Sequence, residues 1–216
     1  MSRRVVWFFG SWFCRVAILG LMMALAGCSV ALFPEKQPLR IFTLPYDYRP
    51  PAVSDVGRGT LPALKVVRPQ ANGVLSGERI VIEPRPNELA AYSNVRWMTD
   101  GPLLLRDHVV RALREDPRMA TAVSDSSGSG SDITLTSELK AFQEDRTDGS
   151  GTAVRLYLQA QLVENGSRRI LATRDFQVRV PVDGDDIEAA ISAFGQASDQ
   201  LSRALADWVV AALSDY

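Results

Sequence analysis

The 216-residue chain has only two cysteines and a single histidine. Cys14 lies inside an apolar N-terminal run, and Cys28 lies just after it. If the chain is cut before Cys28 and this thiol is acylated, no free thiol remains, which excludes a disulfide and a cysteine nucleophile. With His108 as the only imidazole, a zinc or iron site would need mainly carboxylates. We therefore expect no metal and no cofactor.

The short motifs that usually carry catalysis are also missing. The sequence has no Gly-x-Ser-x-Gly elbow, no phosphate-binding glycine loop and no paired His-Glu motif. His108 falls on the charged side of a predicted helix, so we expect it to be solvated, among Asp107, Arg111 and Glu115. An anchored hydrolase that uses His108 is the weakest of the alternatives, and we predict that the protein is not an enzyme.

Positive charge is not in excess either. The formal net charge is −1, and removal of residues 1–27, with three basic and no acidic residues, changes it to −4. A mildly acidic chain has no electrostatic reason to bind nucleic acid.

What the sequence does have is a lipoprotein signal at its N-terminus. Leu25-Ala26-Gly27-Cys28 has the form of a lipobox, in which cleavage occurs between Gly27 and Cys28. Arg3 and Arg4 precede an apolar stretch, as in a secretory signal peptide. A transmembrane helix is the alternative, but the run is short for one and Arg15 interrupts it.

The lipobox predicts how the chain is divided and where it resides. Residues 1–27 form the signal peptide, residues 28–38 the acylated N-terminus and its tether, and residues 39–216 a single domain. Acyl chains on Cys28 would hold this domain on a membrane, because each buried methylene contributes about 0.8 kcal/mol. Ser29, rather than Asp, follows the cysteine, which favours export to the periplasmic face of the outer membrane.

Alternating and apolar patterns predict the secondary structure of the domain. We expect strands at Leu39–Leu44, Leu64–Arg68, Arg79–Glu83 and Leu89–Tyr92, and a later run at Ile133–Ala141, Val154–Leu162 and Ile170–Val180. Asn165-Gly166 is a strong hairpin signal between the last two. Asp100 and Pro117 bound a first helix, and a second spans about Asp185–Leu213. The fold class is α+β, with a mainly antiparallel sheet packed against two helices in one compact domain.

The apolar stripe of the second helix has two interpretations. Its members recur at alternating spacings of four and three: Ile187, Ile191, Phe194, Ser198, Leu201, Leu205, Trp208 and Ala212. A coiled coil would give this spacing, but the stripe is short and Phe, Ser and Trp are poor residues for such a seam. A helix that lies across the sheet with its stripe in the core is the better interpretation.

A polar stretch before the first helix supplies the candidate binding residues Tyr92, Arg96 and Trp97. One interpretation is that Trp97 fastens the start of the helix to the core. The other is that the three residues form a partner-binding surface, for which aromatic residues and arginine are favoured.

Several segments together resemble a known family. They are Phe42-Thr43-Leu44, Leu64–Arg68, Gly77-Glu78-Arg79-Ile80, Tyr92-x-x-x-x-Trp97 and Pro102-Leu103, after a lipoprotein signal and before a three-strand meander and a closing helix. This arrangement resembles the ABC-type transport auxiliary lipoprotein family, which includes paraquat-inducible protein C, over about Leu39 to Leu213. Met98-Thr99-Asp100 departs from the family pattern, which often has small or acidic residues and a proline at this point.

The resemblance implies a function. Such lipoproteins sit on the outer membrane and partner with MCE-domain proteins of the inner membrane, which work with ABC permeases to move phospholipids or other hydrophobic molecules. Family members are not known for catalysis, and some assemble as rings, so a homo-oligomer is one expectation. The alternative function is that of a structural accessory lipoprotein in another envelope assembly machine.

Overall fold

The computed structural model describes residues 38–52, 61–147, 149 and 151–214. The predicted signal peptide and the predicted acylation site, Cys28, lie outside these residues. Leu39–Tyr216 forms one compact unit, and every buried core residue of the described chain belongs to it. Within the described ranges, no helix is long and apolar enough to cross a membrane.

The elements follow the predicted order, with additional short strands. They are β1 (Arg40–Phe42), β2 (Leu64–Val66), the 3-10 helix η1 (Gly73–Ser76), β3 (Val81–Arg85), β4 (Glu88–Ala91), β5 (Val95–Trp97), α2 (Gly101–Glu115), β6 (Ala122–Ser124), β7 (Ile133–Asp145), β8 (Ala153–Glu164), β9 (Ile170–Pro181) and α3 (Ile187–Leu213). The predicted helices and the three long strands are therefore present, whereas β5 and β6 were not predicted as strands.

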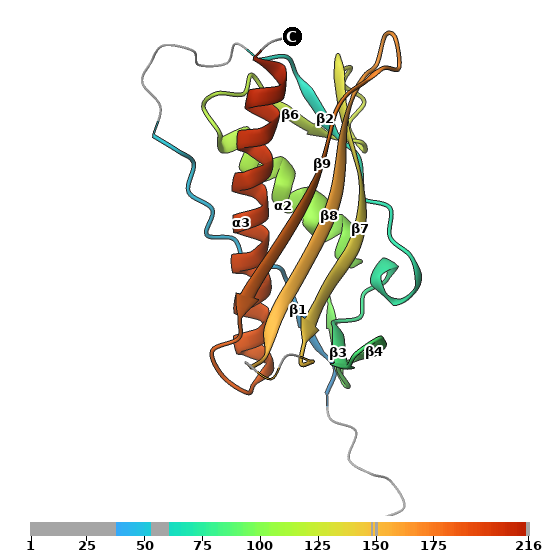
Figure 1. The fold of residues 1–216 in the computed structure, drawn as a ribbon, viewed down its shortest axis with the longest axis vertical. Coiled ribbons are helices and arrows are strands. Elements are labelled where there is room, and N and C mark those ends of the chain that lie inside the picture. Colours follow the sequence, from blue (N-terminus) through green and yellow to red (C-terminus); the bar gives the residue numbers. More distant parts are fainter. Residues whose placement is uncertain (1–37, 53–60, 148, 150, 215–216) are drawn as a thin grey trace, which may run out of the picture. The chain divides into compact units, whose positions relative to one another are not determined.

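The main sheet has seven strands and is built around β7 (Figure 1). One edge of β7 pairs along its length with β8, which pairs with β9, and both pairings are antiparallel. The other edge of β7 is shared by two short parallel strands, β2 near its start and β3 near its end. The sheet is thus mixed, and the prediction of a mainly antiparallel sheet was wrong. Side-chain alternation indicates which face of a strand is buried, not the direction of its neighbour.

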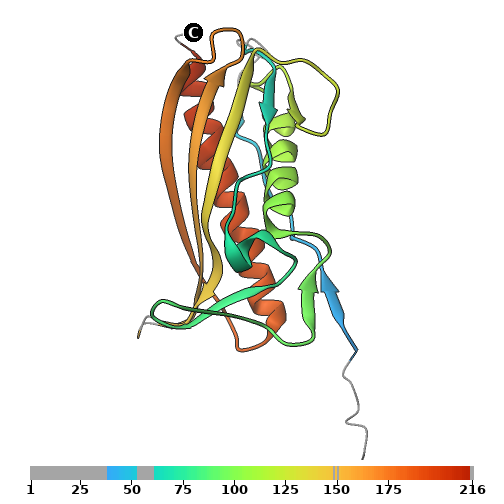
Figure 2. The ribbon, with the colours of Figure 1, turned by 90° about the vertical axis from the view of Figure 1, so that its right-hand side faces the viewer.

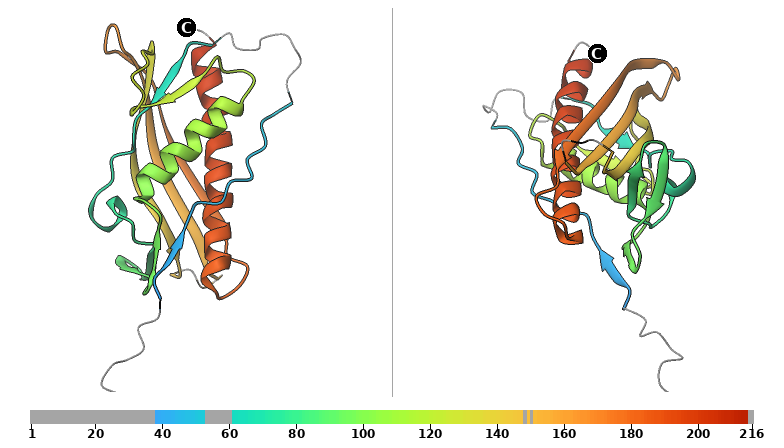
Figure 3. Two further views of the ribbon diagram at one scale, coloured as in Figure 1. Left: turned by 180° about the vertical axis from the view of Figure 1, so that it is seen from behind. Right: turned by 60° about the horizontal axis from the view of Figure 1, so that its bottom comes forward.

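Both helices cover the same face of this sheet, which curls around them (Figures 1 and 2). α3 packs on β8 and β9 and also contacts α2, while α2 lies against β2 and β6. Seen from behind, α2 crosses α3 obliquely, and the chain that follows β1 runs over both helices (Figure 3). The stripe of α3 is buried in the core, as expected for a helix that lies across the sheet.

Local sequence signals explain where the helices begin. The Asp100 carboxylate accepts a hydrogen bond from the backbone N–H of Leu103 at 2.9 Å, and Pro102 occupies the first turn of α2. In the same way, the Asp186 carboxylate accepts one from the Ala189 N–H at 2.8 Å at the start of α3. These caps satisfy donors that the helices themselves leave unpaired.

A β-bulge in β7 changes which side chains reach the core. The pairing with β8 shifts between Leu139 and Ala141, so Lys140 is the extra residue. Beyond it Phe142 joins the core cluster. The bulge thereby turns the last part of β7 toward the aromatic centre of the domain.

Candidate functional site

The Trp97 side chain lies in the core and not on a surface. It is 1% exposed, stacks on Phe142 with ring centroids 6.0 Å apart, and meets the edge of Phe194 at 5.3 Å. This is the arrangement expected if Trp97 fastens the start of α2 to the core. Of the three residues predicted to bind a partner, only Tyr92 and Arg96 are within reach of one.

β5 places Arg96 beside the first strand of the domain. β1 and β5 form a separate two-stranded parallel sheet, in which Ile41 lies opposite Arg96 and Phe42 opposite Trp97. The Arg96 guanidinium is half-exposed and pairs with Glu78. Arg96 and Trp97, adjacent in sequence, therefore point to opposite faces of one strand.

Tyr92 belongs to a polar cluster at the end of the main sheet. Its hydroxyl donates to the Glu144 carboxylate and accepts a hydrogen bond from the Arg146 guanidinium at 2.8 Å. Burial, reinforced by the hydrogen bond to Glu144, raises the pKa of Tyr92 to about 12, so the phenol is neutral. A cavity of about 200 Å³ adjoins the cluster. It is lined by Tyr92, Glu144, Arg146, Thr152, Val182, Gly184, Asp185 and Asp186.

Two acidic residues of this region, Glu144 and Asp145, are buried. Glu144 is 1% exposed and Asp145 4% exposed. Asp145 accepts hydrogen bonds from Thr147 and from the Arg179 guanidinium at 2.9 Å, and these hold its pKa below the ordinary value despite burial. The sequence does not predict the burial of Asp145, because its partner Arg179 comes from β9, 34 residues later.

His108 is also buried, so the prediction that it is solvated was wrong. Its Nε2 lies 2.8 Å from an Asp199 carboxylate oxygen on α3, and its ring packs on Tyr46 with centroids 4.8 Å apart. Burial lowers the pKa of His108, and the Asp199 carboxylate opposes that shift. The error arose because the chain after β1 covers the side of α2 that the sequence left open to solvent.

The His108–Asp199 pair has a further partner in the chain after β1. In the described part of the chain, no hydroxyl group forms a hydrogen bond with His108. The other oxygen of Asp199 accepts the backbone N–H of Asp47 at 3.2 Å. The pair therefore joins α2, α3 and the chain after β1, which is a structural arrangement. Across the same described residues, no group of three or more metal-ligating side chains is found.

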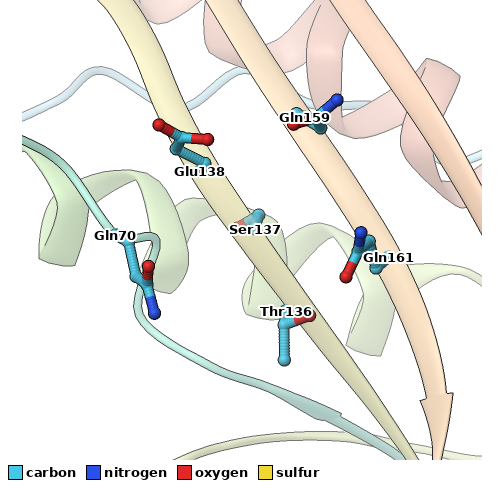
Figure 4. Close-up of a pocket in the computed structure, with 6 residues that line it drawn as sticks. All are labelled: Gln70, Thr136, Ser137, Glu138, Gln159 and Gln161. Carbon is cyan, nitrogen blue, oxygen red and sulfur yellow. The ribbon is translucent and has the colours of Figure 1, made fainter. Parts of the chain in front are cut away.

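A second polar cavity lies on the outer face of the main sheet (Figure 4). Its volume is about 200 Å³, and its lining consists of Gln70, Thr136, Ser137, Glu138, Gln159 and Gln161. The helices lie behind the strands in this view, so the cavity opens away from the core. Thr136 faces Gln161, and Glu138 faces Gln159, across the β7–β8 ladder. The amides, hydroxyls and the Glu138 carboxylate of this lining can form hydrogen bonds with other polar groups.

These observations define a class: an α+β domain with two helices on one face of a curled mixed sheet and with polar surface cavities. The ABC-type transport auxiliary lipoprotein component family matches residues 42–206. The chain belongs to this family.

Solved structures share the fold. Protein XCC0632 from Xanthomonas campestris is 26% identical, with a TM-score of 0.73, and the match covers 81% of this chain and 97% of that one. A second structure, described as an uncharacterized protein, is 20% identical with a TM-score of 0.62, and the match covers 80% of this chain and 99% of that one. A search of curated proteins finds no match.

Proposed function

We propose that this protein is a non-catalytic, outer-membrane-anchored subunit of an MCE/ABC-type intermembrane lipid transport system. The family match over residues 42–206 carries the proposal, because members are auxiliary components of ABC-type transport. The lipoprotein docks the periplasmic end of an MCE-domain protein at the outer membrane. The buried His108–Asp199 pair agrees with a role without catalysis.

The anchor in this proposal is Cys28, acylated after cleavage behind Gly27. Two or more acyl chains hold a protein on one leaflet far more firmly than a single chain does. Ser29 directs the lipoprotein to the outer membrane, and the tether that ends at Pro38 leaves the domain on the periplasmic side. The formal charge of −4 for the mature chain, which follows from residues 28–216, gives it no general attraction to anionic lipid.

The docking surface that we propose is the cluster around Tyr92. Tyr92 and Arg146 are both partly accessible and border a cavity of about 200 Å³. The lining of this cavity also includes Asp186, the N-cap of α3. Tyrosine and arginine are enriched among residues that dominate binding energy. Charged groups at such a rim mainly steer association and select the partner. The interactions of Tyr92 with Glu144 and Arg146 hold its side chain in place before a partner arrives.

Crosslinking in living cells tests the proposal. The tagged lipoprotein is recovered in mild detergent, and its partners are identified by mass spectrometry. We expect an MCE-domain protein with the natural chain and with Arg174→Glu, a matched charge reversal on the exposed part of β9. Arg146→Glu should abolish that recovery. A copurifying β-barrel in place of an MCE-domain protein would instead favour the structural accessory function.

Two further measurements complete the test. Deletion of the protein should disturb the lipid balance of the outer membrane, and an unchanged balance would count against a transport role. Light scattering of the purified lipoprotein in detergent would give its mass. More than one copy per particle would support a homo-oligomer like the rings that some family members form, and a monomer would exclude it.

A further inference from the structure

Three large apolar side chains are exposed together on the two-stranded sheet. Leu39 is 55% exposed, Ile41 53% and Met98 58%. Leu39 immediately precedes β1, Ile41 lies within it, and Met98 immediately follows β5. The backbone N–H of Met98 donates to the Phe42 carbonyl at 2.7 Å, so the two chain segments are directly joined there. We call Leu39, Ile41 and Met98 the apolar strand face.

The strand register explains why this face is outside. Side chains alternate along a strand, and paired residues point to the same side. Phe42 lies opposite Trp97, which is buried, so that side faces the core. Ile41 and Arg96 form the neighbouring pair, one residue earlier on each strand. Their side chains therefore point away from the core. The buried Trp97 holds the sheet in place, so the apolar strand face is a fixed surface of the folded domain.

The apolar strand face begins where the predicted tether ends. Only residues 29–38 lie between the acylation site, Cys28, and Leu39. An extended chain spans at most about 3.3–3.6 Å per residue, so the 11 residue steps from Cys28 to Leu39 reach roughly 40 Å at most. The acyl chains on Cys28 would therefore keep this face close to the lipid surface. This step rests on the anchoring in the proposed function.

Cationic groups lie beside the apolar side chains. Arg96 and Arg79 border an open groove of about 480 Å³ next to η1. Glu78 neutralises part of this charge through its pair with Arg96, but the Arg96 Nε is buried and has no hydrogen-bond partner among the described residues. Guanidinium groups bind phosphate oxygens well, and long arginine side chains reach the headgroup level while apolar neighbours go deeper.

The other two large exposed apolar side chains of the described residues lie outside the two-stranded sheet. Leu89 lies in β4, an edge strand of the main sheet, and Ile170 starts β9 at the hairpin at the top of Figure 1, at the opposite end from β1. Single exposed apolar residues are common, but a contiguous apolar group marks an interaction site. We propose that the apolar strand face rests on the phospholipid surface, with Leu39, Ile41 and Met98 at the acyl boundary and Arg79 and Arg96 on lipid phosphates.

Fluorescence quenching in proteoliposomes tests this contact. The mature acylated protein has no free thiol, because Cys14 leaves with the signal and Cys28 carries lipid. Ile41→Cys therefore introduces one site for an environment-sensitive dye. The vesicles contain phosphatidylethanolamine and phosphatidylglycerol with a spin-labelled lipid as quencher. Arg40→Cys is the matched control, since Arg40 is the same distance along the tether but points to the opposite side of β1, toward Glu188.

We expect a blue shift and strong quenching of the dye at position 41, and neither at position 40. Adding Leu39→Ser and Met98→Ser to the Ile41→Cys chain should remove the quenching while the acyl anchor remains. Equal signals at positions 40 and 41 would overturn the proposal. Quenching at position 41 that does not change with the two serine substitutions would also overturn it.

A protein partner is the other possible occupant, and the same reporter distinguishes it. If the dye at position 41 is unquenched in vesicles and shifts only when the transport partner is added, the face is a protein interface and the membrane proposal fails. The proposed function fails by a different measurement, the loss of any MCE-domain partner in cells. Each proposal can therefore fail while the other holds.

Discussion

Gly195 of α3 lies directly against Pro45. A Cβ atom at Gly195 would be 2.8 Å from the Pro45 Cβ and 3.0 Å from the Pro45 carbonyl oxygen. A glycine within a helix costs about 1 kcal/mol relative to alanine. At this position the glycine allows the chain after β1 to cross α3 in close contact. The crossing is next to the point where the Tyr46 ring packs on His108.

Gly195→Ala should therefore destabilise the protein although alanine is the better helix former. The added methyl group must displace Pro45, and overpacking of this kind costs roughly 1–3 kcal/mol, which exceeds the gain in helix propensity. Chemical denaturation measures the free energy of unfolding. Gln200→Ala, at an exposed position of the same helix, is the control and should change it little. A Gly195→Ala protein as stable as the natural one would show that the contact is not tight.

Trp97→Ala should be among the most destabilising single substitutions in the domain. It removes a ring that is 1% exposed and contacts Phe142 and Phe194, and losses of this type cost about 3–5 kcal/mol. Arg96→Ala, at the next position but on the outer face, should cost under about 1 kcal/mol. Thermal unfolding followed by circular dichroism compares the two. Similar losses would contradict the assignment of opposite faces.

His108 should make the stability depend on pH. Because burial lowers its pKa from 6.5, the unfolded chain binds a proton that the folded chain does not, and stability falls as the pH drops through the ordinary value. Near the histidine, Asp199 opposes this shift, Arg111 adds to it and Glu115 opposes it. The free energy of unfolding should decrease from about pH 7.5 to about pH 5.5, by at most about 1.4 kcal/mol per pH unit.

His108→Gln removes the titrating group while it keeps a polar side chain beside Asp199. Its free energy of unfolding should vary less over the same pH interval, whatever its absolute value. Denaturant titrations of both chains at the two pH values provide the comparison. An unchanged pH dependence would assign the effect to other groups.

Cys28→Ser should abolish lipid attachment. Only the thiol of the lipobox cysteine accepts diacylglycerol, so metabolic labelling with palmitate should mark the natural protein and not this variant. Cys14→Ser is the matched control, because Cys14 lies in the predicted signal peptide, and it should be labelled normally. Labelling that persists in Cys28→Ser would refute the predicted acylation site.

The sequence predicts the long elements because their signals are local. Asp100 before α2 and the alternation of β7, β8 and β9 each arise within a few residues, and the structure agrees with them. The order of the strands around β7 has no such local signal, because β2 and β3 pair with β7 from distant parts of the chain. The bulge at Lys140 also has no clear local signal.

The candidate site shows the same limit. Trp97 could be assigned to the core or to a surface, and only the three-residue pairing of β5 with β1 decides between them. His108 was predicted to be solvated because the covering segment, which includes Tyr46, lies more than 60 residues earlier and has no regular pattern. Side chains whose partners are distant in sequence are where prediction from one chain fails.

The parallel pairing of β1 and β5 also determines how the domain responds to force. A pull on the tether enters at Leu39 and acts along β1. Its hydrogen bonds to β5, from Arg40 N to the Asn94 carbonyl and from Met98 N to the Phe42 carbonyl, are then sheared together rather than opened one after another. The next resistance along the chain is Pro45 against Gly195. If the predicted anchor on Cys28 holds the protein, an extracting force therefore meets the pairing of β1 with β5 before it reaches the main sheet.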